Sequence, residues 1–400
     1  MQRKSLNIGL FGFGCVGYGL YEVLEKTPTL QTSIKKICVK HEEKERVISK
    51  DHFTFDKYDI LDDDEINVIV ELIDDADAAF EIVSYALKHG KAVVTANKKM
   101  IAEHIEELLE LQAKHNVPLL YEAACCASIP IIRNLEEYYD NDLLESIEGI
   151  INGSTNYILT KTFEEGTGYS EALAKAQELG YAESNSILDT GGYDAKYKLI
   201  ILILHAFGVK TKPDEILNLG IDRLGELELN YAREKSLKIK LIAQAYKTVH
   251  GDIVAFVIPT FVSKTEKLFT VDDVFNGIIT KTAFADTQFF VGKGAGAYPT
   301  ASAVLSDISA LSYDYRYEYK KLNNSEIILP YDNLYGRILL RHNTENQSEI
   351  ELYFEEIHEK YANQSLGYVI GILSFAKLHD LILCHQESVS AILFDTIDKV

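Results

Sequence analysis

The stretch GLFGFGCVGYGL, from Gly9 to Leu20, decides how the N-terminal part of this chain folds. Three glycines, Gly12, Gly14 and Gly17, stand at the spacing G-x-G-x-x-G between an apolar run and a helical pattern. In dinucleotide-binding units such glycines permit a tight turn, close approach of the backbone to a pyrophosphate, and close packing of helix on strand. The alternative is a glycine-rich turn without a ligand. We favour a cofactor loop made of Gly12, Phe13, Gly14, Cys15, Val16 and Gly17.

Short apolar runs alternate with helical patterns over the first 120 residues around this loop. The expected strands are Leu6–Phe11, Ile34–Val39, Asn67–Leu72, Lys91–Thr95 and Pro118–Tyr121. The expected helices are Val16–Lys26, Ala79–His89 and Ile101–His115. This alternation predicts βαβ units and a Rossmann-like, doubly wound parallel sheet.

The pattern changes after about residue 140 to an α+β arrangement. It predicts strands at Ile147–Ile151, Ile253–Val262 and Thr287–Val291, and helices at Tyr169–Gly180, Asp194–Phe207 and Ala232–Thr248. The tail has strand candidates at Arg337–Arg341 and Glu349–Phe354 and a helical run at Gly367–His379. We therefore expect a cofactor domain at 1–135, a catalytic and dimerisation domain at 136–325, with 292–310 returning to the cofactor domain, and a small α+β tail at 326–400.

Composition excludes several classes of protein. The 400 residues carry a formal net charge of -21, which is unfavourable for binding nucleic acid or an anionic membrane. The sequence contains no unbroken run of about 18 apolar residues, so we expect no membrane span. The five cysteines form no CxxC pair, and we interpret them as reduced thiols of a cytoplasmic protein.

The charged residues after the second expected strand bear on the choice of cofactor. Lys40 comes first, followed by His41, Glu42, Glu43 and, a little later, Arg46. An acidic residue at this point favours the ribose hydroxyl of NAD, whereas a basic one accommodates the 2′-phosphate of NADP. Lys40 therefore favours NADP, and the alternative is a charged surface turn.

A second stretch, LDTGGYDAKYKL (Leu188–Leu199), places Asp194 and Lys198 one helical turn apart. Such a pair can be an exposed ion pair that adds a few tenths of a kcal/mol. It can equally be a carboxylate and an ammonium that share a substrate. Both alternatives predict the same spacing, so this stretch alone leaves them open.

Five stretches together resemble one family, homoserine dehydrogenase, and occur in its order over roughly residues 6 to 310. They are TANKKMIA (Thr95–Ala102), YEAACCASIPII (Tyr121–Ile132), GIINGSTNYILT (Gly149–Thr160), LGYAESNSILDTGGYDAKYKLIIL (Leu179–Leu202) and GKGAGAYPTASAVLSDI (Gly292–Ile308). The resemblance implies reversible, NAD(P)H-dependent reduction of L-aspartate 4-semialdehyde to L-homoserine, in threonine and methionine biosynthesis. It also implies a homodimer.

The resemblance implies a role for individual residues as well. Lys198 matches the proton donor, and Lys98 matches a second lysine at the reacting centre beside the nicotinamide. Glu183 and Asp194 match substrate-binding positions, with Asp189 in support. Gly180 and Gly296 match positions where the backbone approaches the cofactor. In the family a sodium ion is often held near the cofactor by a Glu side chain and backbone carbonyl groups. Glu122 matches the side-chain ligand, and Cys125, Ala127 and Ile129 match the carbonyl positions.

Three departures from the family pattern stand out. Asp74 and Asp75 replace a glycine pair at a strand end, which predicts a reshaped loop near an anionic cofactor. The turn Cys125–Ser128 replaces glycine-rich sequence, although non-glycine residues tolerate positive φ poorly. The tail has the size of a ligand-sensing ACT domain but shows no Pro-Gly turn and no helix after its first strand, so the resemblance does not extend to threonine feedback.

Two other functions remain alternatives at this point. One is a catalytically silent relative that binds a nucleotide and acts as a sensor or scaffold. This alternative is favoured by Asp74, Asp75 and the altered tail. The other is a Rossmann dehydrogenase that acts on a different small amino-aldehyde.

Overall fold

The computed structural model describes residues 4–141, 143–182, 185–322, 328, 331–385 and 388–398. The chain divides into two compact units. The first unit takes in residues 1–141, 200–212 and 292–322, and the second takes in residues 142–199, 213–291 and 323–400.

The first unit is built on a six-stranded sheet in which every pairing is parallel. Its strands are β1 (Leu6–Phe11), β2 (Thr32–Cys38), β3 (Phe53–Thr54), β4 (Val68–Glu71), β5 (Ala92–Thr95) and β6 (Leu119–Leu120). The order β3-β2-β1-β4-β5-β6 is that of a dinucleotide-binding sheet, and it confirms the expected fold class. The central strands are buried on both faces because helices cover both sides, so that Ile8 and Val70 are fully enclosed.

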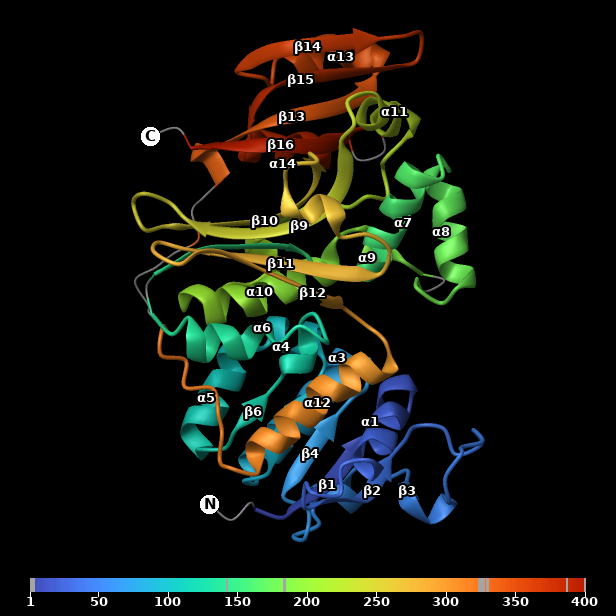
Figure 1. Ribbon diagram of the computed structural model, residues 1–400, viewed down its shortest axis with the longest axis vertical. Coiled ribbons are helices and arrows are strands. Elements are labelled where there is room, and N and C mark those ends of the chain that lie inside the picture. The colour runs from blue at the N-terminus through green and yellow to red at the C-terminus, as the bar shows by residue number, and fades with distance from the viewer. Residues whose placement is uncertain are drawn as a thin grey trace. The chain divides into compact units, whose positions relative to one another are not determined.

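The helices of the first unit connect these strands and close the sheet. They are α1 (Cys15–Glu25), α2 (Tyr58–Leu61), α3 (Ala76–Lys88), α4 (Lys98–Glu103), α5 (Ile105–His115), α6 (Ile131–Arg133) and the late helix α12 (Ala297–Leu311). In Figure 1, α12 lies beside α1 although nearly three hundred residues separate them. The contact is close at Gly19, where an added Cβ would lie 3.0 Å from the carbonyl oxygen of Ala297.

The second unit contains a mixed sheet of ten strands with the path β12-β11-β7-β9-β10-β16-β13-β15-β14, and β8 pairs with β10 off this path. The strands are β7 (Leu144–Ile150), β8 (Leu217–Asn218), β9 (Lys238–Lys247), β10 (Ile253–Val262), β11 (Phe275–Thr282), β12 (Asp286–Lys293), β13 (Leu334–Asn343), β14 (Glu356–Ala362), β15 (Leu366–Ser374) and β16 (Ser390–Asp398). The predictions for β1 and β10 match the observed bounds residue for residue.

Helices connect the strands of this second sheet. They are α7 (Gly153–Glu164), α8 (Tyr169–Glu178), α9 (Ile187–Thr190), α10 (Tyr193–Phe207), α11 (Glu226–Glu234), α13 (Gln347–Glu351) and α14 (Phe375–Cys384). Helix α10 is divided between the units, since residues 193–199 belong to the second unit and 200–207 to the first.

The prediction of one helix over Ala232–Thr248 is wrong. Helix α11 ends at Glu234, Ser236 adopts a φ of 55°, and the antiparallel strand β9 follows. Lys238 and Lys240 on this strand are both buried in the sheet. They can be there because Asp272, far along the chain, pairs with both.

Two predictions in the tail are also wrong. Glu349–Phe354 was expected as a strand but overlaps α13, and Gly367–His379 was expected as a helix but begins with β15 and only then enters α14. The tail therefore does have a helix after its first strand. Its elements run βαββαβ with the strand order β16-β13-β15-β14, a ferredoxin-like plan.

Two further findings concern the whole described chain. All five cysteines are described, and each is a free thiol. Among the described residues, no helix has the length and apolar character needed to cross a membrane.

Candidate active site

The glycine-rich loop of the first unit joins β1 to α1. Gly12 has a φ of 92°, and a Cβ there would lie 2.6 Å from the carbonyl oxygen of Leu72. A Cβ on Gly17 would lie 2.3 Å from the carbonyl oxygen of Gly12, so the helix can approach the strand only with glycine at this position. Gly14 is the N-cap of α1, and a Cβ there would meet no protein atom within 4 Å. The loop therefore offers uncapped helix amides beside open space, which is the cradle a diphosphate requires.

Residues around this loop hold it from the side. The Phe13 ring lies edge-on to Phe53 with ring centroids 5.2 Å apart, and the guanidinium of Arg46 lies 4.9 Å from the centroid of the Phe53 ring. Arg46 also donates hydrogen bonds to the carbonyl groups of Lys44 and His41. Lys40 is exposed just after β2. The segment after β2 thus places basic groups on the same edge of the sheet as the glycine loop.

A buried carboxylate organises the loops after β4 and β5. Glu71 ends β4 and is fully enclosed; it accepts hydrogen bonds from the amide of Ile73 at 2.7 Å and the hydroxyl of Thr95 at 2.5 Å. Burial raises the pKa of Glu71 to about 7. Asn97, which caps α4, donates to the carbonyl of Ile73 at 3.1 Å. Lys98 follows at the first position of α4 and is half-buried.

Asp74 and Asp75, the unexpected acidic pair, lie at the start of α3. Both are exposed, and the Asp75 carboxylate accepts a hydrogen bond from the amide of Ala78 at 3.1 Å as the N-cap of the helix. Aspartate is among the preferred N-cap residues because it satisfies an amide that the helix leaves open. This gives Asp75 a local role in α3.

The predicted sodium ligand Glu122 lies in a buried acidic cluster of the first unit. Its carboxylate accepts hydrogen bonds from the amides of Ile132 at 2.9 Å and Arg133 at 2.8 Å, and its own amide donates to Asp307. Arg133 pairs with Asp307 at 2.9 Å. Burial, together with the charge of Asp307, raises the pKa of Glu122 to about 8, and burial raises the pKa of Asp307 to about 7. Two buried carboxylates therefore share one guanidinium.

The carbonyl positions predicted for that ion lie in a strained turn. Cys126 and Ala127 adopt φ values of 55° and 36°, a region that favours glycine. Ser128 anchors the turn by donating through both its amide and its hydroxyl to the carbonyl of Lys293, at 3.1 and 3.0 Å. The turn Cys125–Ser128 therefore does adopt the positive φ values that non-glycine residues tolerate poorly.

The second unit brings three of the predicted residues together. Lys198 Nζ donates to Asp194 Oδ2 at 2.6 Å and to the carbonyl oxygen of Ile151 at 2.8 Å. Asn152 Nδ2 donates to the same Asp194 oxygen at 2.8 Å and to Asp189 Oδ1 at 2.7 Å. Lys198 and Asp194 are only 8% and 5% exposed, so this is not a solvated pair on a helix surface.

The local folds explain how these side chains meet. Strand β7 ends at Ile150, and Asn152 caps α7 by accepting a hydrogen bond from the amide of Thr155 at 2.8 Å. Gly192, with a φ of 80°, turns the chain from α9 into α10, which puts Asp194 in the first helical turn. A carboxylate is favourable at a helix N-terminus, because the helix dipole is positive there.

The remaining predicted residues are spread over the chain. Gly180 ends α8 with a φ of 73°, and Gly296, with a φ of 114°, is the N-cap of α12. Lys98 and Gly296 belong to the first unit, while Gly180 belongs to the second. Glu183, the other predicted substrate ligand, lies outside the described residues.

Asn152 is the residue that sequence reasoning missed. It lies inside the stretch GIINGSTNYILT but carries no charge, so a search for acids and bases passes over it. The available signal was its place between a strand and a helical pattern, where asparagine is a favoured N-cap. That signal predicts the cap but not the two carboxylates that its amide bridges.

Comparison with known proteins identifies the family of the chain. The family model described as homoserine dehydrogenase matches residues 130–309, and the model of its NAD binding domain matches residues 12–122. The homoserine dehydrogenase of Lactococcus lactis is 38% identical over 315 residues, which are 76% of this chain and 73% of that protein. The crystal structure of a homoserine dehydrogenase from Thiobacillus denitrificans superposes with a TM-score of 0.86 at 27% identity and covers 98% of both chains. A hyperthermophilic archaeal homoserine dehydrogenase mutant in complex with NADPH has a TM-score of 0.68 at 27% identity, covering 79% of this chain and all of that one.

Proposed function

This chain belongs to the homoserine dehydrogenase family, and we propose that Lys198 exchanges the proton in its reaction. The protein is an NAD(P)-dependent oxidoreductase that interconverts L-aspartate 4-semialdehyde and L-homoserine. Bound NAD(P)H supplies the hydride that reaches the aldehyde carbon. The oxygen then carries negative charge, and the Lys198 ammonium donates a proton from Nζ to it. In the reverse direction the neutral amine accepts the hydroxyl proton.

The observation that carries this proposal is the pair of acceptors around Lys198. Asp194 at 2.6 Å and the Ile151 carbonyl at 2.8 Å hold the ammonium in one orientation within a site from which water is largely excluded. A fixed donor in such a site is more effective than a solvated one, because it needs no reorganisation as charge develops.

A cofactor-absorbance assay with L-homoserine at alkaline pH tests this role. Lys198→Ala should lower kcat by about 100-fold or more, since general acid–base catalysis contributes roughly that much. NADPH binding, measured by fluorescence titration, should be retained. The matched control is Lys196→Ala, two residues away on α10 and equally buried at 8% exposure, with its ammonium 5.1 Å from the Tyr193 ring centroid. Full activity in Lys198→Ala, or an equal loss in both variants, would refute the assignment.

Asp194 and Asp189, together with Glu183, hold the substrate ammonium in this proposal. In support, the Asn152 amide binds both carboxylates and so brings Asp189 and Asp194 together, and paired carboxylates suit a cationic ligand. Asp189→Asn should therefore raise the KM for L-homoserine more than it lowers kcat.

Lys98 acts as the second lysine at the reacting centre in the same scheme. It follows β5 at the carboxyl end of a parallel strand, where dinucleotide-binding sheets bind their ligands. Asn97 caps the helix that Lys98 begins and ties it to the Ile73 carbonyl. Gly180 and Gly296 contact the cofactor through their backbone in this proposal.

We further propose NADP as the preferred cofactor. Lys40 is exposed after β2, and Arg46 is held nearby against Phe53, so two cations are available for a 2′-phosphate. The structural relative solved with NADPH is consistent with this preference. The test is the ratio of kcat/KM with NADPH to kcat/KM with NADH. This ratio should fall in Lys40→Ala.

A sodium ion beside Glu122 is a further proposal. Among the described residues, the buried carboxylates of Glu122 and Asp307 share the guanidinium of Arg133, and a monovalent cation would offset the excess negative charge. The carbonyl groups of Cys125, Ala127 and Ile129 would complete an oxygen set, which suits a hard cation. Among the described residues no group of three or more His, Cys, Asp or Glu side chains forms a metal site, so backbone oxygen must supply the other ligands.

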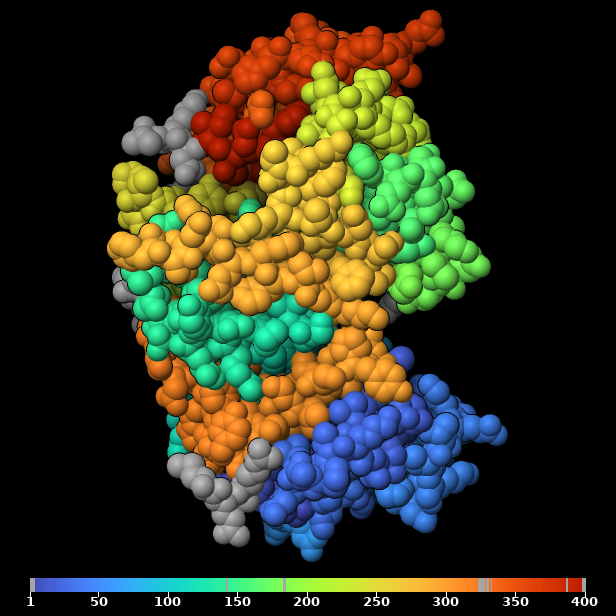
Figure 2. Space-filling model, in the orientation of Figure 1, coloured from blue at the N-terminus to red at the C-terminus, as the bar shows by residue number. Residues whose placement is uncertain are grey.

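A homodimer formed through the second unit is proposed on the basis of its surface. The β11–β12 hairpin lies on the face shown in Figure 2, and Phe284 between these strands is 86% exposed. Val291 on β12 is 53% exposed. Light scattering on the purified protein would give the mass. The five free thiols support a cytoplasmic location, where disulfides are rare.

The tail at 326–400 forms an ACT-like domain in our proposal. Its support is the βαββαβ order of β13 to β16 with two intervening helices. The first of these helices, α13, has only five residues.

A further inference from the structure

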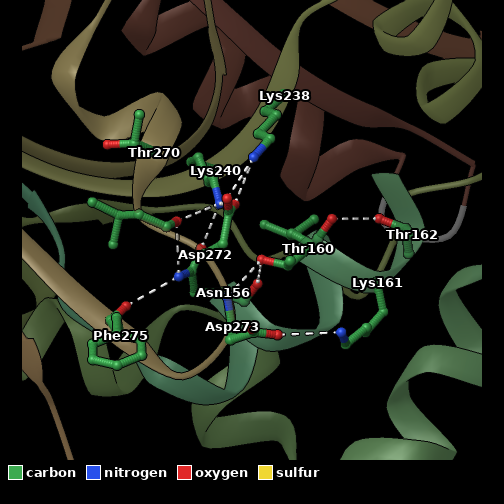
Figure 3. Close-up of polar contacts among 12 residues, drawn as sticks. Asn156, Thr160, Lys161, Thr162, Lys238, Lys240, Thr270, Asp272, Asp273 and Phe275 are labelled. Carbon is green, nitrogen blue, oxygen red and sulfur yellow. Dashed lines mark hydrogen bonds and ion pairs between the residues drawn. The ribbon is translucent and has the colours of Figure 1, made fainter. Parts of the chain in front are cut away.

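A second lysine of the second unit, Lys240 on β9, is more deeply buried than Lys198. Its side chain is 1% exposed, and its Nζ donates to Asn156 Oδ1 at 2.8 Å, to the Val271 carbonyl at 2.6 Å and to Asp272 Oδ1 at 3.0 Å (Figure 3). An ammonium has three hydrogens, and each has an acceptor here. Burial lowers the pKa of Lys240 to about 8. The fold therefore keeps a costly cation at this position, although no step of the reaction uses it.

Neutralising the Asp272 carboxylate does not by itself explain the buried Lys240, because a neighbouring lysine also pairs with this carboxylate. Lys238 binds the Asp272 carboxylate with both oxygens at 2.7 Å and lies 4.7 Å from the centroid of the Phe269 ring. Asp272 thus has a cation whether or not Lys240 is present. What Lys240 adds is its contact with Asn156 on α7, which Lys238 does not make among the described contacts.

Asn156 connects this cluster to the first turn of α7. Its Nδ2 donates to the carbonyl groups of Val271 and Phe275 at 3.1 and 3.0 Å, while its Oδ1 accepts from Lys240. Farther along the helix, Thr160 accepts a hydrogen bond from the amide of Asp273 at 3.0 Å. One side of α7 is therefore fixed to the 271–275 segment, as Figure 3 shows.

The start of α7 is also fixed by backbone packing. A Cβ on Gly153 would lie 2.8 Å from the carbonyl oxygen of Val274, so the two backbone segments are in direct contact there. Asn152 immediately precedes Gly153 and Asn156 follows one turn later. The same helical turn thus carries one asparagine that binds Asp189 and Asp194, and another that binds the buried lysine.

We infer that Lys240 is a positioning residue for the reaction: through Asn156 it sets the place of the first turn of α7, and so the place of the Asn152 amide between the two carboxylates. The inference rests on the proposed role of Lys198 and Asp194. Displacement of a catalytic group by about 1 Å can cost about 100-fold in rate, so a small shift of α7 has a measurable effect.

The test compares Lys240→Met with Lys238→Met. Both substitutions remove a buried ammonium next to Asp272 and each leaves the other lysine in place, so neither leaves that carboxylate unpaired. We expect Lys240→Met to lower kcat/KM for L-homoserine by about 10-fold, while NADPH affinity changes less than about twofold, because the glycine loop belongs to the other unit. Lys238→Met should keep kcat/KM within about twofold of the parent enzyme, since Lys238 contacts α7 near the end of the helix, with Nζ 5.5 Å from the centroid of the Phe163 ring, and not at Asn156 in its first turn.

The pH profile separates positioning from plain stabilisation. If Asn152 moves away, Asp194 loses one donor and its charge acts more fully on Lys198. The alkaline rise of homoserine oxidation should therefore move to higher pH in Lys240→Met and stay in place in Lys238→Met. Equal kinetics and equal profiles in both variants, at whatever melting temperature, would overturn the inference.

A second variant decides the matter if Lys240→Met does not fold. Asn156→Asp keeps an acceptor for Lys240 but removes both donations to the Val271 and Phe275 carbonyl groups. It should lower kcat/KM for L-homoserine and leave NADPH affinity unchanged, and a parent-like kcat/KM would refute the inference. Failure of the proposed function is distinguishable, because Lys198→Ala would then remain active in the same assay.

Discussion

Two strand-to-helix junctions, β4–α3 in the first unit and β7–α7 in the second, begin their helices in the same way. Asp75 accepts a hydrogen bond from the amide of Ala78 at 3.1 Å, and Asn152 accepts one from the amide of Thr155 at 2.8 Å. Either side chain is a favoured N-cap. As caps the two residues are interchangeable.

The rest of the two environments differs. Asp75 is exposed and serves its own helix, whereas Asn152 is 4% exposed and its amide binds Asp189 and Asp194. A cap needs only the chain next to it, but a bridging amide needs partners 37 and 42 residues away. Local sequence therefore specifies the cap, and the tertiary fold specifies the second role.

The largest expected effect comes from separating these two roles in Asn152. Asn152→Ser keeps a good cap but removes both donations to the carboxylates, so kcat/KM for L-homoserine should fall by about 100-fold. The measurement is cofactor absorbance with purified variant, together with its melting temperature. The matched control is Asp75→Ser, which should retain activity. An active Asn152→Ser enzyme would show that the second role is not functional.

The next effect concerns Glu71, the buried carboxylate at the β4–α3 junction. Its pKa of about 7 lies above the unfolded value, so the folded state binds the extra proton and stability falls as pH rises from about 4 to about 7. Glu71→Gln removes this dependence, and the parent protein should lose about 2 kcal/mol more than the variant over that range. Urea unfolding of both proteins at pH 5 and pH 8 measures the difference. Parallel pH curves would contradict it.

A smaller effect is expected at Gly14. A Cβ there would meet no protein atom within 4 Å, and its φ of -82° suits any residue, so Gly14→Ala should leave the melting temperature unchanged. If that space receives the diphosphate, NADPH affinity should weaken by about 10-fold. Gly17→Ala is the comparison, because its Cβ would lie 2.3 Å from backbone and should lower stability as well. Parent-like NADPH binding in Gly14→Ala would remove the loop from the cofactor site.

The smallest effect should come from deleting the simpler cap. Asp75→Ala should cost about 1 kcal/mol of stability, the usual value for a lost N-cap, with kcat/KM nearly unchanged. Chemical denaturation and the same absorbance assay measure the two quantities. A loss of activity as large as that of Asn152→Ser would mean that the two junctions do not differ in the way proposed.

How far the sequence predicted this fold depended on whether the partners were local. Strands β1 and β10 and the glycine loop were predicted because apolar runs and glycine spacing act through neighbouring residues. The helix expected over β9 is wrong because Lys238 and Lys240 are buried in this strand, and the carboxylate of Asp272 that pairs with both lies 34 and 32 residues away. The helix expected at Gly367–His379 is wrong because β15 and α14 join at Ser374 within one largely apolar run, whereas the strand expected at Arg337–Arg341 lies within β13.

The sequence by itself determined the parallel sheet, the glycine loop and, through five ordered stretches, the family. Only the tertiary structure decided that the Asp194–Lys198 spacing is a buried pair, that Asn152 bridges it to Asp189, and that the buried Lys240 contacts the same helical turn. The physical reason is one of range. Turns, caps and periodicity are set by atoms within a few residues, whereas a buried charge is stable only where distant segments supply every hydrogen-bond partner.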